Sequence, residues 1–523
     1  MRILDLTLRP EEAFNDSLFP ELLYERLGLK NDGSVWVNPV KRSIDARGKN
    51  VIVRFQCEVY NAGEERPVAT FRKEYPNVKD RKNILIIGSG PAGLFAALRV
   101  ISLGYRPIVF ERGKDVQSRR RDLAAINKDH IVNPESIYCF GEGGAGTYSD
   151  GKLYTRSKKR GDVRRILETL VAHGARRDIL FDAHPHIGTN NLPKLVSALS
   201  QTILDHGGEI HFNTKVVDFI LPGDSIQGVV LSSGEKVRGE AVILATGHSA
   251  RDIFYLLQKR NMLIECKPFA LGLRVEHAQD LIDRIQYHCP ADRGPYLPAS
   301  SYALVHQAVV HGQARGVFSF CMCPGGFIVP AATAPGEVVV NGMSPSRRDS
   351  VFANSGIVVA VEEKDFVSYQ KHGALAGLAF QSEIERIACA SAGGTQSAPA
   401  QRLVDFVEGK ISKELLPTSY QPGVTSVDMK ELLPDFIYQS LRIAFRDFGK
   451  KMKGYYTNDA QVLGVESRTS SPVKIPRDRE TLEHLQIKKL FPCGEGAGYA
   501  GGIVSAAMDG ESCAEAAVKK IAG

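Results

Sequence analysis

Three glycines and one acid carry the strongest chemical signal in the sequence. Gly88, Gly90 and Gly93 follow an apolar run, and Glu111 ends the next one. In a dinucleotide fingerprint the first glycine allows a tight turn, the second lets the backbone approach a pyrophosphate, and the third lets a helix lie near the strand. Glu111 is placed to accept hydrogen bonds from both ribose hydroxyls. The spacing therefore predicts a dinucleotide-binding site.

A strand, a helix and a second strand must position these residues. Residues 84–87 are continuously apolar, as in a parallel strand buried on both faces. Pro91 stands near the first helical turn, where its missing N–H costs nothing, and Gly104 stands where a helix ends. The helix N-terminus therefore presents free N–H groups to a diphosphate. Besides the glycines, the expected contacts are Pro91, Ala92, Glu111 and Arg112.

A second glycine-rich turn lies at residues 494–502, followed by a helix of small residues. The Glu495 carboxylate can reach a ribityl or phosphate group. N–H groups of residues 501–504 can point at the pyrimidine edge of an isoalloxazine, where reduced flavin is negative. A packing helix explains the alanines but not five glycines in so short a run. The expected contacts are Gly494, Glu495, Gly501, Gly502 and Ile503.

Two further segments fit the same ligand. The glycine loop at residues 141–146 can lie against an isoalloxazine, with Thr147, Tyr148 and Ser149 as donors, or it is a structural turn. Strands at residues 208–217, 226–231 and 241–245, separated by turn signals, predict a small antiparallel meander and a last strand, with an ordinary hairpin as the alternative. The expected contacts are Gly143, Gly144, Ala145, Gly146, Thr147, Val216, Thr246 and Gly247.

Together these segments resemble a bacterial family of FAD-dependent dehydrogenases or oxidoreductases whose substrates are largely unassigned. The likeness includes CFGEGGAGTYSDGKLYTR (139–156), HIGTNNLP (186–193), FCMCPGG (320–326), ESRTSSPVKIPRD (466–478) and GEGAGYAGGIVSAAMDG (494–510). The resemblance implies bound FAD, a glutathione-reductase-like FAD domain, a second domain covering the flavin and a small amino-terminal domain. It implies no particular reaction.

The predicted fold class is α/β: a glutathione-reductase-like Rossmann domain that binds FAD, with an inserted α+β substrate domain and a small amino-terminal α+β domain. We expect the amino-terminal domain at residues 1–80, the FAD domain at 81–255 and 456–523, and the inserted domain at 256–455.

Local patterns predict the elements of the two other domains. The amino-terminal domain should hold strands at 2–8, 34–40 and 51–60, a helix at 20–29 and a linker at 61–82. The inserted domain should hold strands at 270–276, 316–321 and 338–342, amphipathic helices at 362–386 and 400–411, and a surface loop at 390–400.

Composition excludes several classes of protein. The 66 Lys and Arg against 59 Asp and Glu give a diluted net charge of +7, which argues against nucleic acid as a partner, and the basic clusters at 119–121 and 158–160 are expected to be solvated. No signal-peptide core or membrane-length apolar segment is seen, so we expect a cytoplasmic protein without a membrane partner. Nine scattered cysteines are expected to be reduced. No metal is expected, and the oligomeric state stays open.

Two histidines and two arginines are candidates for catalysis. His184 and His186, on one face of an extended segment, can move a proton near neutral pH, or they are structural histidines. Arg274 at a strand end and Arg468 before a Thr-Ser-Ser run can hold a carboxylate or phosphate, or they make ion pairs.

Asp150 and Lys152, beside the glycine loop, are the remaining catalytic candidates, and a salt bridge explains them equally well. Cys321 and Cys323 face the same way on a strand and can be redox-active, but they lack a C-x-x-C spacing at a helix start.

The leading functional hypothesis is a flavoenzyme that transfers a hydride between a small organic substrate and flavin N5. No second GxGxxG marks a dedicated NAD(P)H domain, so either NAD(P)H binds transiently as a reductant or the electrons come from elsewhere. Two alternatives stay open: a flavin-dependent RNA-modifying protein, which should show a strongly basic face, and a non-catalytic flavin sensor, which should lack a cleft open to solutes.

Overall fold

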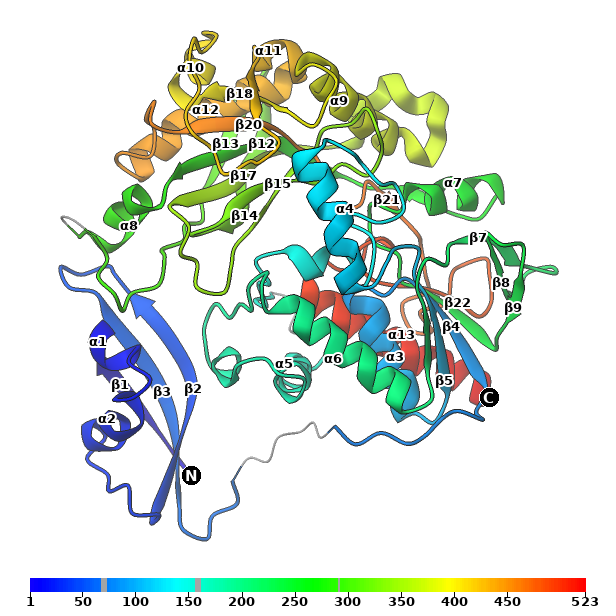
Figure 1. The fold of residues 1–523 in the computed structure, drawn as a ribbon, viewed down its shortest axis with the longest axis horizontal. Helices are drawn as coiled ribbons and strands as arrows, with labels where there is room; N and C mark the ends of the chain where they lie inside the picture. Colours follow the sequence, from blue (N-terminus) through cyan, green and yellow to red (C-terminus); the bar gives the residue numbers. More distant parts are fainter. Residues whose placement is uncertain (67–72, 156–160, 290–291) are drawn as a thin grey trace.

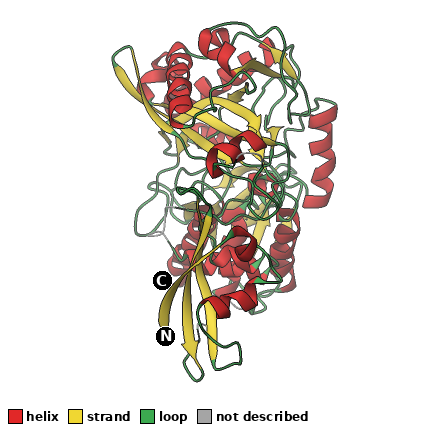
Figure 2. Ribbon diagram, turned by 90° about the vertical axis from the view of Figure 1, so that its left-hand side faces the viewer, coloured by secondary structure: helices red, strands yellow, loops and turns green. Residues whose placement is uncertain are grey.

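The computed structural model describes residues 1–66, 73–155, 161–289 and 292–523. A small three-stranded domain, a parallel-sheet domain and a larger domain with a mixed sheet make up the chain (Figure 1). Figure 2 turns the molecule by a quarter and keeps the larger domain above the other two. Part of the expected linker, residues 67–72, lies outside the described residues, as does the basic cluster at 158–160.

The amino-terminal domain is an antiparallel sheet in the order β1-β3-β2, packed against two short helices. Its elements are β1 (Arg2–Leu8), α1 (Pro10–Ala13), α2 (Phe19–Arg26), β2 (Val35–Asp45) and β3 (Ile52–Asn61). Alternate side chains of β3, from Val53 to Val59, are buried in its core, as the period of a strand requires. The three expected strands and the longer helix are confirmed; the short helix α1 was not predicted.

The parallel sheet has the order β22-β10-β4-β5-β6. Its strands are β4 (Asn83–Ile87), β5 (Arg106–Phe110), β6 (Glu209–His211), β10 (Ala241–Leu244) and β22 (Leu490–Pro492). Ile84 and Ile86 face a helical layer, whereas Leu85 and Ile87 face the opposite layer. Both faces of the sheet are therefore covered, and the central strands β4, β5 and β10 are apolar beyond their first residues.

The helical layer consists of α3 (Pro91–Ser102), α5 (Val163–Ala172), α6 (Leu192–Asp205) and α13 (Ile503–Ala522). The other face carries the meander β7 (Val216–Ile220), β8 (Gly228–Leu231) and β9 (Lys236–Arg238), with α4 (Val116–Lys128) and α7 (Arg251–Lys259) nearby. Two short 3-10 helices, η1 (Gly144–Tyr148) and η3 (Arg177–Leu180), lie in loops of the same domain. The expected meander is confirmed.

The second domain is built on a seven-stranded sheet in the order β13-β14-β17-β12-β20-β18-β19. These strands are β12 (Phe269–Ala278), β13 (Val305–Val310), β14 (Gln313–Cys323), β17 (Phe352–Val361), β18 (Ala398–Arg402), β19 (Val424–Ser426) and β20 (Gln461–Glu466). Along β12, Leu271, Leu273 and Val275 enter the apolar core, whereas Arg274 and Glu276 lie on the other face. That polar face is buried too, so its charges must find partners.

Helices and small hairpins complete the second domain. They are α8 (Gln279–Tyr287), η4 (Glu363–Leu375), α9 (Ala376–Ser391), α10 (Leu403–Glu408), α11 (Met429–Leu432) and α12 (Asp435–Lys451), with β15 (Phe327–Pro330) paired to β16 (Val340–Met343) and β11 (Glu265–Cys266) paired to β21 (Val473–Lys474).

Four expected elements are wrong in part. The surface loop at 390–400 is shorter, because α9 runs to Ser391 and the buried strand β18 begins at Ala398. The strand at 208–217 is two strands, β6 and β7, because the chain turns at Asn213, whose φ is 53°. The helix at 362–386 is interrupted at Gly373, where φ is 57° and η4 gives way to α9. The helix at 400–411 begins as strand β18, because pairing with β20 in the middle of a sheet overrides the local helical pattern.

The structure also differs from the expectations at one domain boundary and at one basic residue. The second domain extends beyond residue 455, because β20 (Gln461–Glu466) pairs with both β12 and β18. Arg119, expected on a solvated face, has no exposed area, while its neighbours Arg120 and Arg121 are exposed. All nine cysteines are free thiols. Among the described residues, no helix is long and apolar enough to cross a membrane.

Candidate functional site

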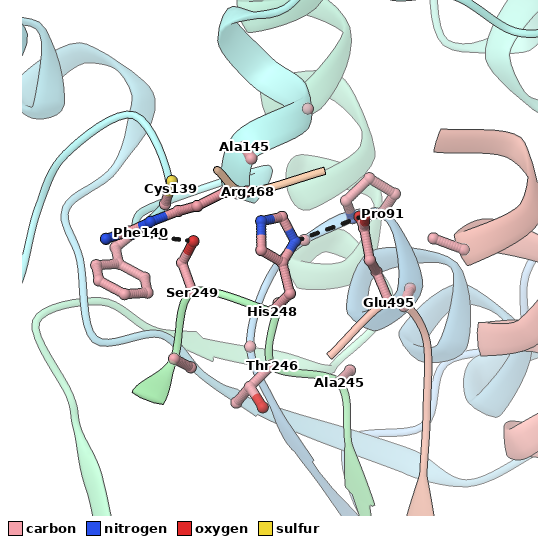
Figure 3. A pocket seen from close by; sticks show the side chains of 18 of the residues that line it. Pro91, Cys139, Phe140, Ala145, Ala245, Thr246, His248, Ser249, Arg468 and Glu495 are labelled. Carbon is pink, nitrogen blue, oxygen red and sulfur yellow. Dashed lines mark hydrogen bonds and ion pairs between the residues drawn. The ribbon is translucent and has the colours of Figure 1, made fainter. Parts of the chain in front are cut away.

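A cavity runs between the parallel sheet and the second domain, and most of the expected cofactor contacts line it (Figure 3). Fifteen of them do: Gly88, Gly90, Pro91, Ala92, Glu111, Arg112, Gly144, Ala145, Gly146, Val216, Thr246, Gly247, Glu495, Gly502 and Ile503. Gly93, Gly143, Thr147, Gly494 and Gly501 are not among its lining residues. We call the lining around Gly88, Gly90 and Glu111 the turn region.

The turn between β4 and α3 requires glycine at two of its positions. Gly88 has φ 100°, and its N–H donates to Phe110 O at 2.8 Å across to β5. A Cβ on Gly93 would stand 1.9 Å from the carbonyl oxygen of Gly88. The helix therefore lies against the strand end, and Gly93 acts in packing, as the fingerprint predicts.

Gly90 is different, because neither its backbone conformation nor a contact with the described residues requires a glycine at this position. Its φ of −69° and ψ of −177° are open to any residue, and a Cβ there would meet no protein atom within 4 Å. Gly90 nevertheless lines the cavity at the N-terminus of α3, where the first N–H groups of a helix lack partners. The space a Cβ would fill belongs to a ligand, and an anionic one fits. Gly502, at the N-terminus of α13, has equally open space.

Glu111 is already fully paired. Its Oε2 accepts hydrogen bonds from the Ser89 N–H at 3.0 Å and the Ser89 hydroxyl at 2.9 Å, and its Oε1 accepts from the N–H groups of Gly113 and Gly141, both at 2.9 Å. These donors use about four acceptor positions, the capacity of a carboxylate. Glu111 therefore joins three loops of the turn region, and a ribose hydroxyl would replace one of these donors.

Arg119 holds the glycine loop at residues 141–146. Its guanidinium donates to four carbonyl oxygens, those of Ile137, Tyr138, Glu142 and Gly144, at 2.8 to 2.9 Å. Burial lowers its pKa, and no carboxylate pairs with it directly. The buried Arg119 guanidinium thus holds the backbone of the glycine loop in place.

The expected side-chain donors of this loop bond to the protein's own backbone, and of the three only Ser149 lines the cavity. Thr147 donates to Glu142 O, Tyr148 to Val116 O and Ser149 to Gly146 O. A Cβ on Gly143 would collide with the Thr147 hydroxyl. Gly143 and Thr147 therefore shape the loop, while Gly144, Ala145 and Gly146 face the cavity with their backbone.

His248 was not predicted, and it lies in the cavity directly after the Thr246-Gly247 pair. Its Nδ1 is 3.6 Å from Glu495 Oε1, which joins the end of β10 to the turn before α13 (Figure 3). The sequence signal was its place one residue beyond a predicted contact. Gly494 stays outside the cavity, because its N–H donates to Asp509 and a Cβ would stand 3.0 Å from Ala92 Cβ.

A second group of residues gathers where the loop after η1 meets β14; we call Asp150, Lys152, Cys321 and Arg348 the bulge region. Asp150 accepts two hydrogen bonds from Arg348, at 3.1 and 2.7 Å, and Lys152 Nζ is 3.7 Å from Asp150 Oδ2. Burial would raise the pKa of Asp150, but the charges of Lys152 and Arg348 lower it. Burial would lower the pKa of Lys152, but Cys321, Cys323 and Asp150 raise it. Both side chains are therefore charged at neutral pH.

Lys152 is 37% exposed, and it lines the cavity. Its Nζ has Asp150 at 3.7 Å and the Cys323 sulfur at 3.8 Å, both longer than a strong hydrogen bond. This ammonium therefore keeps donor capacity for a molecule in the cavity.

Cys321 interrupts the regular pairing of β14. The register with β17 shifts between Phe320 and Cys323, and Cys321 has φ 46°, a left-handed conformation that costs a non-glycine residue energy. The carbonyl oxygen of Cys321 accepts a hydrogen bond from Arg274 at 2.8 Å. The bulge thus places Cys321 on the cavity wall.

The remaining catalytic candidates have other roles. His184 is exposed, and His186 bonds to Ser346 O behind the cavity; burial lowers its pKa. Arg274 is fully buried behind Cys321 and pairs with Glu466, whose pKa burial raises to about 7. None of these three side chains lines the cavity.

Arg468 does line the cavity, but its five N–H donors are all used. They reach Ser249, Thr333, Glu337 and, through two nitrogens, Glu385, at 2.6 to 3.3 Å. Figure 3 shows the bond to Ser249. Arg251 pairs with the same two glutamates. Since Arg251 and Ser249 follow β10 while Glu337 and Glu385 lie in the second domain, this buried network joins the two domains rather than binding a substrate.

Comparison with known proteins relates the chain to FAD-dependent proteins. Residues 268–469 match the profile of an FAD-dependent protein, C-terminal domain-like, residues 154–312 match that of an FAD dependent oxidoreductase, and residues 1–60 match a domain of unknown function. An uncharacterized protein of Clostridium beijerinckii is 37% identical over 540 residues, covering 99% of each chain. The chain belongs to a family of FAD-dependent oxidoreductases.

Other similarities to this FAD-dependent oxidoreductase are more distant. The thiamine thiazole synthase of Aeropyrum pernix is 24% identical over 218 residues, or 39% of this chain and 67% of that protein. Among solved structures, the flavin-dependent brominase Bmp2 is 13% identical with a TM-score of 0.36, covering 84% of this chain and 80% of that chain. CtdE in complex with FAD is 13% identical with a TM-score of 0.30, covering 85% and 88%.

Proposed function

We propose that the protein transfers a hydride between a small organic substrate and bound FAD, and that NAD(P)H binds transiently in the same cleft as a reductant. The observation that carries the proposal is the half-buried, charged Lys152, which keeps donor capacity on the wall of a cavity that fits a dinucleotide. FAD, when bound, supplies a two-electron acceptor and donor. The chain supplies binding, orientation and protons.

The binding residues act through their backbone. The N-termini of α3 and α13 present N–H groups to the diphosphate and to the negative edge of the ring system. Open space at Gly90 and Gly502 lets a ligand approach both helices. The Glu111 and Arg119 networks fix the loops in advance, so little ordering remains for the moment of binding.

The bulge region positions the substrate. The Lys152 ammonium can donate a hydrogen bond, or a proton, to the oxygen or nitrogen atom of the substrate whose charge changes when the hydride moves. Arg348 holds Asp150 in place beside Lys152, and Cys321, Cys323 and Asp150 raise the pKa of Lys152, so that it stays charged. Phe320, Ile503 and Ala506 add apolar wall and limit water in the cavity.

The test is anaerobic mixing of the purified yellow protein with NADPH, NADH and their 4R- and 4S-deuterated forms, while the flavin absorbance is recorded. The proposal predicts bleaching by one nucleotide, slowed by deuterium on only one face. Lys152→Met should retain FAD and bleach about 100-fold more slowly, whereas Lys488→Met, on the exposed surface, should match the wild type. If dithionite but no nucleotide bleaches the flavin, NAD(P)H is not the donor; equal rates for Lys152→Met would remove Lys152 from the mechanism.

A further inference from the structure

We propose that Cys321 and Cys323 are a redox-active pair that exchanges two electrons with bound FAD by closing and opening a disulfide. The inference rests on the proposed function, because it requires FAD in the cavity. It concerns residues that face the bulge region rather than the glycine turns.

The two cysteines are neighbours at the irregular end of β14. The Cys323 thiol lies 3.2 Å from the Cys321 carbonyl oxygen, to which it can donate. The neighbouring Cys323 side chain is the first cause of the lowered pKa of Cys321, ahead of the charges of Lys152 and Arg274. One sulfur therefore favours the thiolate, and the other, whose pKa is raised, retains its proton. Disulfide exchange needs this division between attacking thiolate and protonated partner.

Two fixed cations surround the pair. Lys152 Nζ is 3.8 Å from the Cys323 sulfur, and the Arg274 guanidinium is held at the Cys321 carbonyl by its hydrogen bond. Asp150 and Glu466 lie behind these cations and are paired with them. The electrostatics thus favour a thiolate on the wall of the cavity, where the pKa of a buried thiol would otherwise rise.

The pair has access to the cavity on one side only. Cys321 lines the same cavity as Gly90 and Gly502, whereas Cys323 is fully buried behind it. The left-handed backbone at Cys321 breaks the strand pairing at this point. Strain kept at a cavity wall in the middle of a well-packed sheet is consistent with a functional constraint.

The step balances without a further reactant. The Cys321 thiolate and the Cys323 thiol form one S–S bond, the S–H bond of Cys323 breaks, and two electrons with that proton pass to FAD. In the reverse direction, reduced FAD returns two electrons and one proton, the S–S bond breaks, and a thiolate and a thiol are restored. The protein then stores two pairs of electrons, one on FAD and one on sulfur.

The chain provides a matched control. Cys493 and Cys513 lie within 4.8 Å of each other beside an arginine, since Arg477 donates to Cys513 at 3.2 Å and to Asp509. Both are fully buried, and neither lines the cavity. Because Arg477 already pairs with Cys513 and Asp509 and the cysteines lie away from the cavity, Cys493 and Cys513 serve here as the unreactive pair.

The experiment is an anaerobic dithionite titration of the air-oxidised FAD-loaded protein. The wild type should take up about four electrons per FAD, Cys323→Ser about two, and Cys513→Ser about four. In parallel, the oxidised protein is denatured in an alkylating reagent and digested. The peptide with Cys321 and Cys323 should be unalkylated and disulfide-linked before reduction and doubly alkylated afterwards.

An uptake of two electrons by the wild type, with both cysteines alkylated in the oxidised protein, would overturn the inference. Should Cys323→Ser fold poorly, the alkylation of the wild type alone decides the matter. A protein that binds no FAD fails the proposed function, whereas one that binds and bleaches FAD but takes up only two electrons fails this inference alone.

Discussion

The turn region and the bulge region of the cavity differ in how completely their charged groups are paired. In the turn region every charged group is satisfied within the parallel-sheet domain: Glu111 accepts four hydrogen bonds, and Arg119 donates to four carbonyl groups. In the bulge region the charges come from both domains and are incompletely paired, as the distances from Lys152 to its partners show. Complete pairing makes the turn region a rigid binding site, whereas incomplete pairing leaves Lys152 of the bulge region able to act on a substrate.

The difference implies that the two regions depend on different parts of the fold. The turn region needs only the parallel sheet and its first loops. The bulge region exists only while the second domain is held in place, and the buried Arg468 network holds it. The predictions below, in order of decreasing effect, act either on the second domain that carries the bulge region or on the turn region.

Removing the arginine that joins the domains should have the largest effect. Arg468→Met leaves Glu337 and Glu385 as buried carboxylates with fewer partners, which costs about 3–5 kcal/mol of unfolding free energy in urea titrations. Arg260→Met, which breaks an ion pair between exposed residues, should cost less than about 1 kcal/mol. Similar losses for the two variants would mean that the network does not join the domains.

Acid should destabilise the second domain through His277. This histidine is buried against Tyr455, its Nδ1 has no hydrogen-bond partner among the described residues, and burial lowers its pKa to about 4. Its neutral form is favoured in the fold, so its stability contribution is complete above the unfolded pKa of about 6.5 and is lost as the pH falls toward 4, by about 3 kcal/mol.

The measurement is the unfolding free energy at pH 7, 6, 5 and 4. His277→Asn should flatten the decline even if it lowers stability at pH 7, whereas His311→Asn, on the surface, should not. An unchanged slope in His277→Asn would contradict this assignment.

Filling the open space at Gly90 should abolish cofactor binding without harming the fold. Gly90→Val adds a side chain where the chain has no atom and the backbone is unstrained, so the melting temperature should stay constant while the FAD affinity falls about 100-fold, or ~2.7 kcal/mol. Gly48→Val, in similarly open space outside the cavity, is the control. Tight FAD binding by Gly90→Val would contradict the assignment of the turn region.

Glu111→Gln should have the smallest effect of the four. In the wild type, backbone N–H groups donate to the Glu111 carboxylate. The side-chain amide of the glutamine variant would turn its own N–H groups toward these donors, which costs about 2 kcal/mol and loosens the turn region. FAD affinity measured by fluorescence titration should fall about tenfold, and Ser89→Ala, which removes one hydroxyl donor, should fall less. An Arg274 variant, in contrast, should leave this affinity intact.

The turn region could be predicted from the sequence because its chemistry is local. Gly88, Gly90 and Gly93 fall within one turn and one helix start, and the apolar runs around them can only be buried strands. The same reasoning failed for Thr147, whose hydroxyl turns inward, because a side-chain rotamer depends on neighbours that spacing does not reveal.

Asp150, Lys152 and Cys321 of the bulge region were candidates from the sequence, but their meeting could not be predicted, because the region is assembled from distant segments. Lys152 and Cys321 are brought together by the contact between two domains, and the strand pattern of β14 gives no sign of its left-handed residue. His184 and His186 have the right chemistry for catalysis but lie away from the cavity. Arg468 was a reasonable anion-binding candidate until its five donors were found to be used within the protein.

A crystal structure of the protein with bound FAD tests the division of the cavity most directly. The account predicts the diphosphate at Gly90 and the N-terminus of α3, the adenosine beside Arg112 and Val216, and the ring system in contact with Cys321 and the N-terminus of α13. A ring system bound beside Arg112, or outside the cavity, would contradict it.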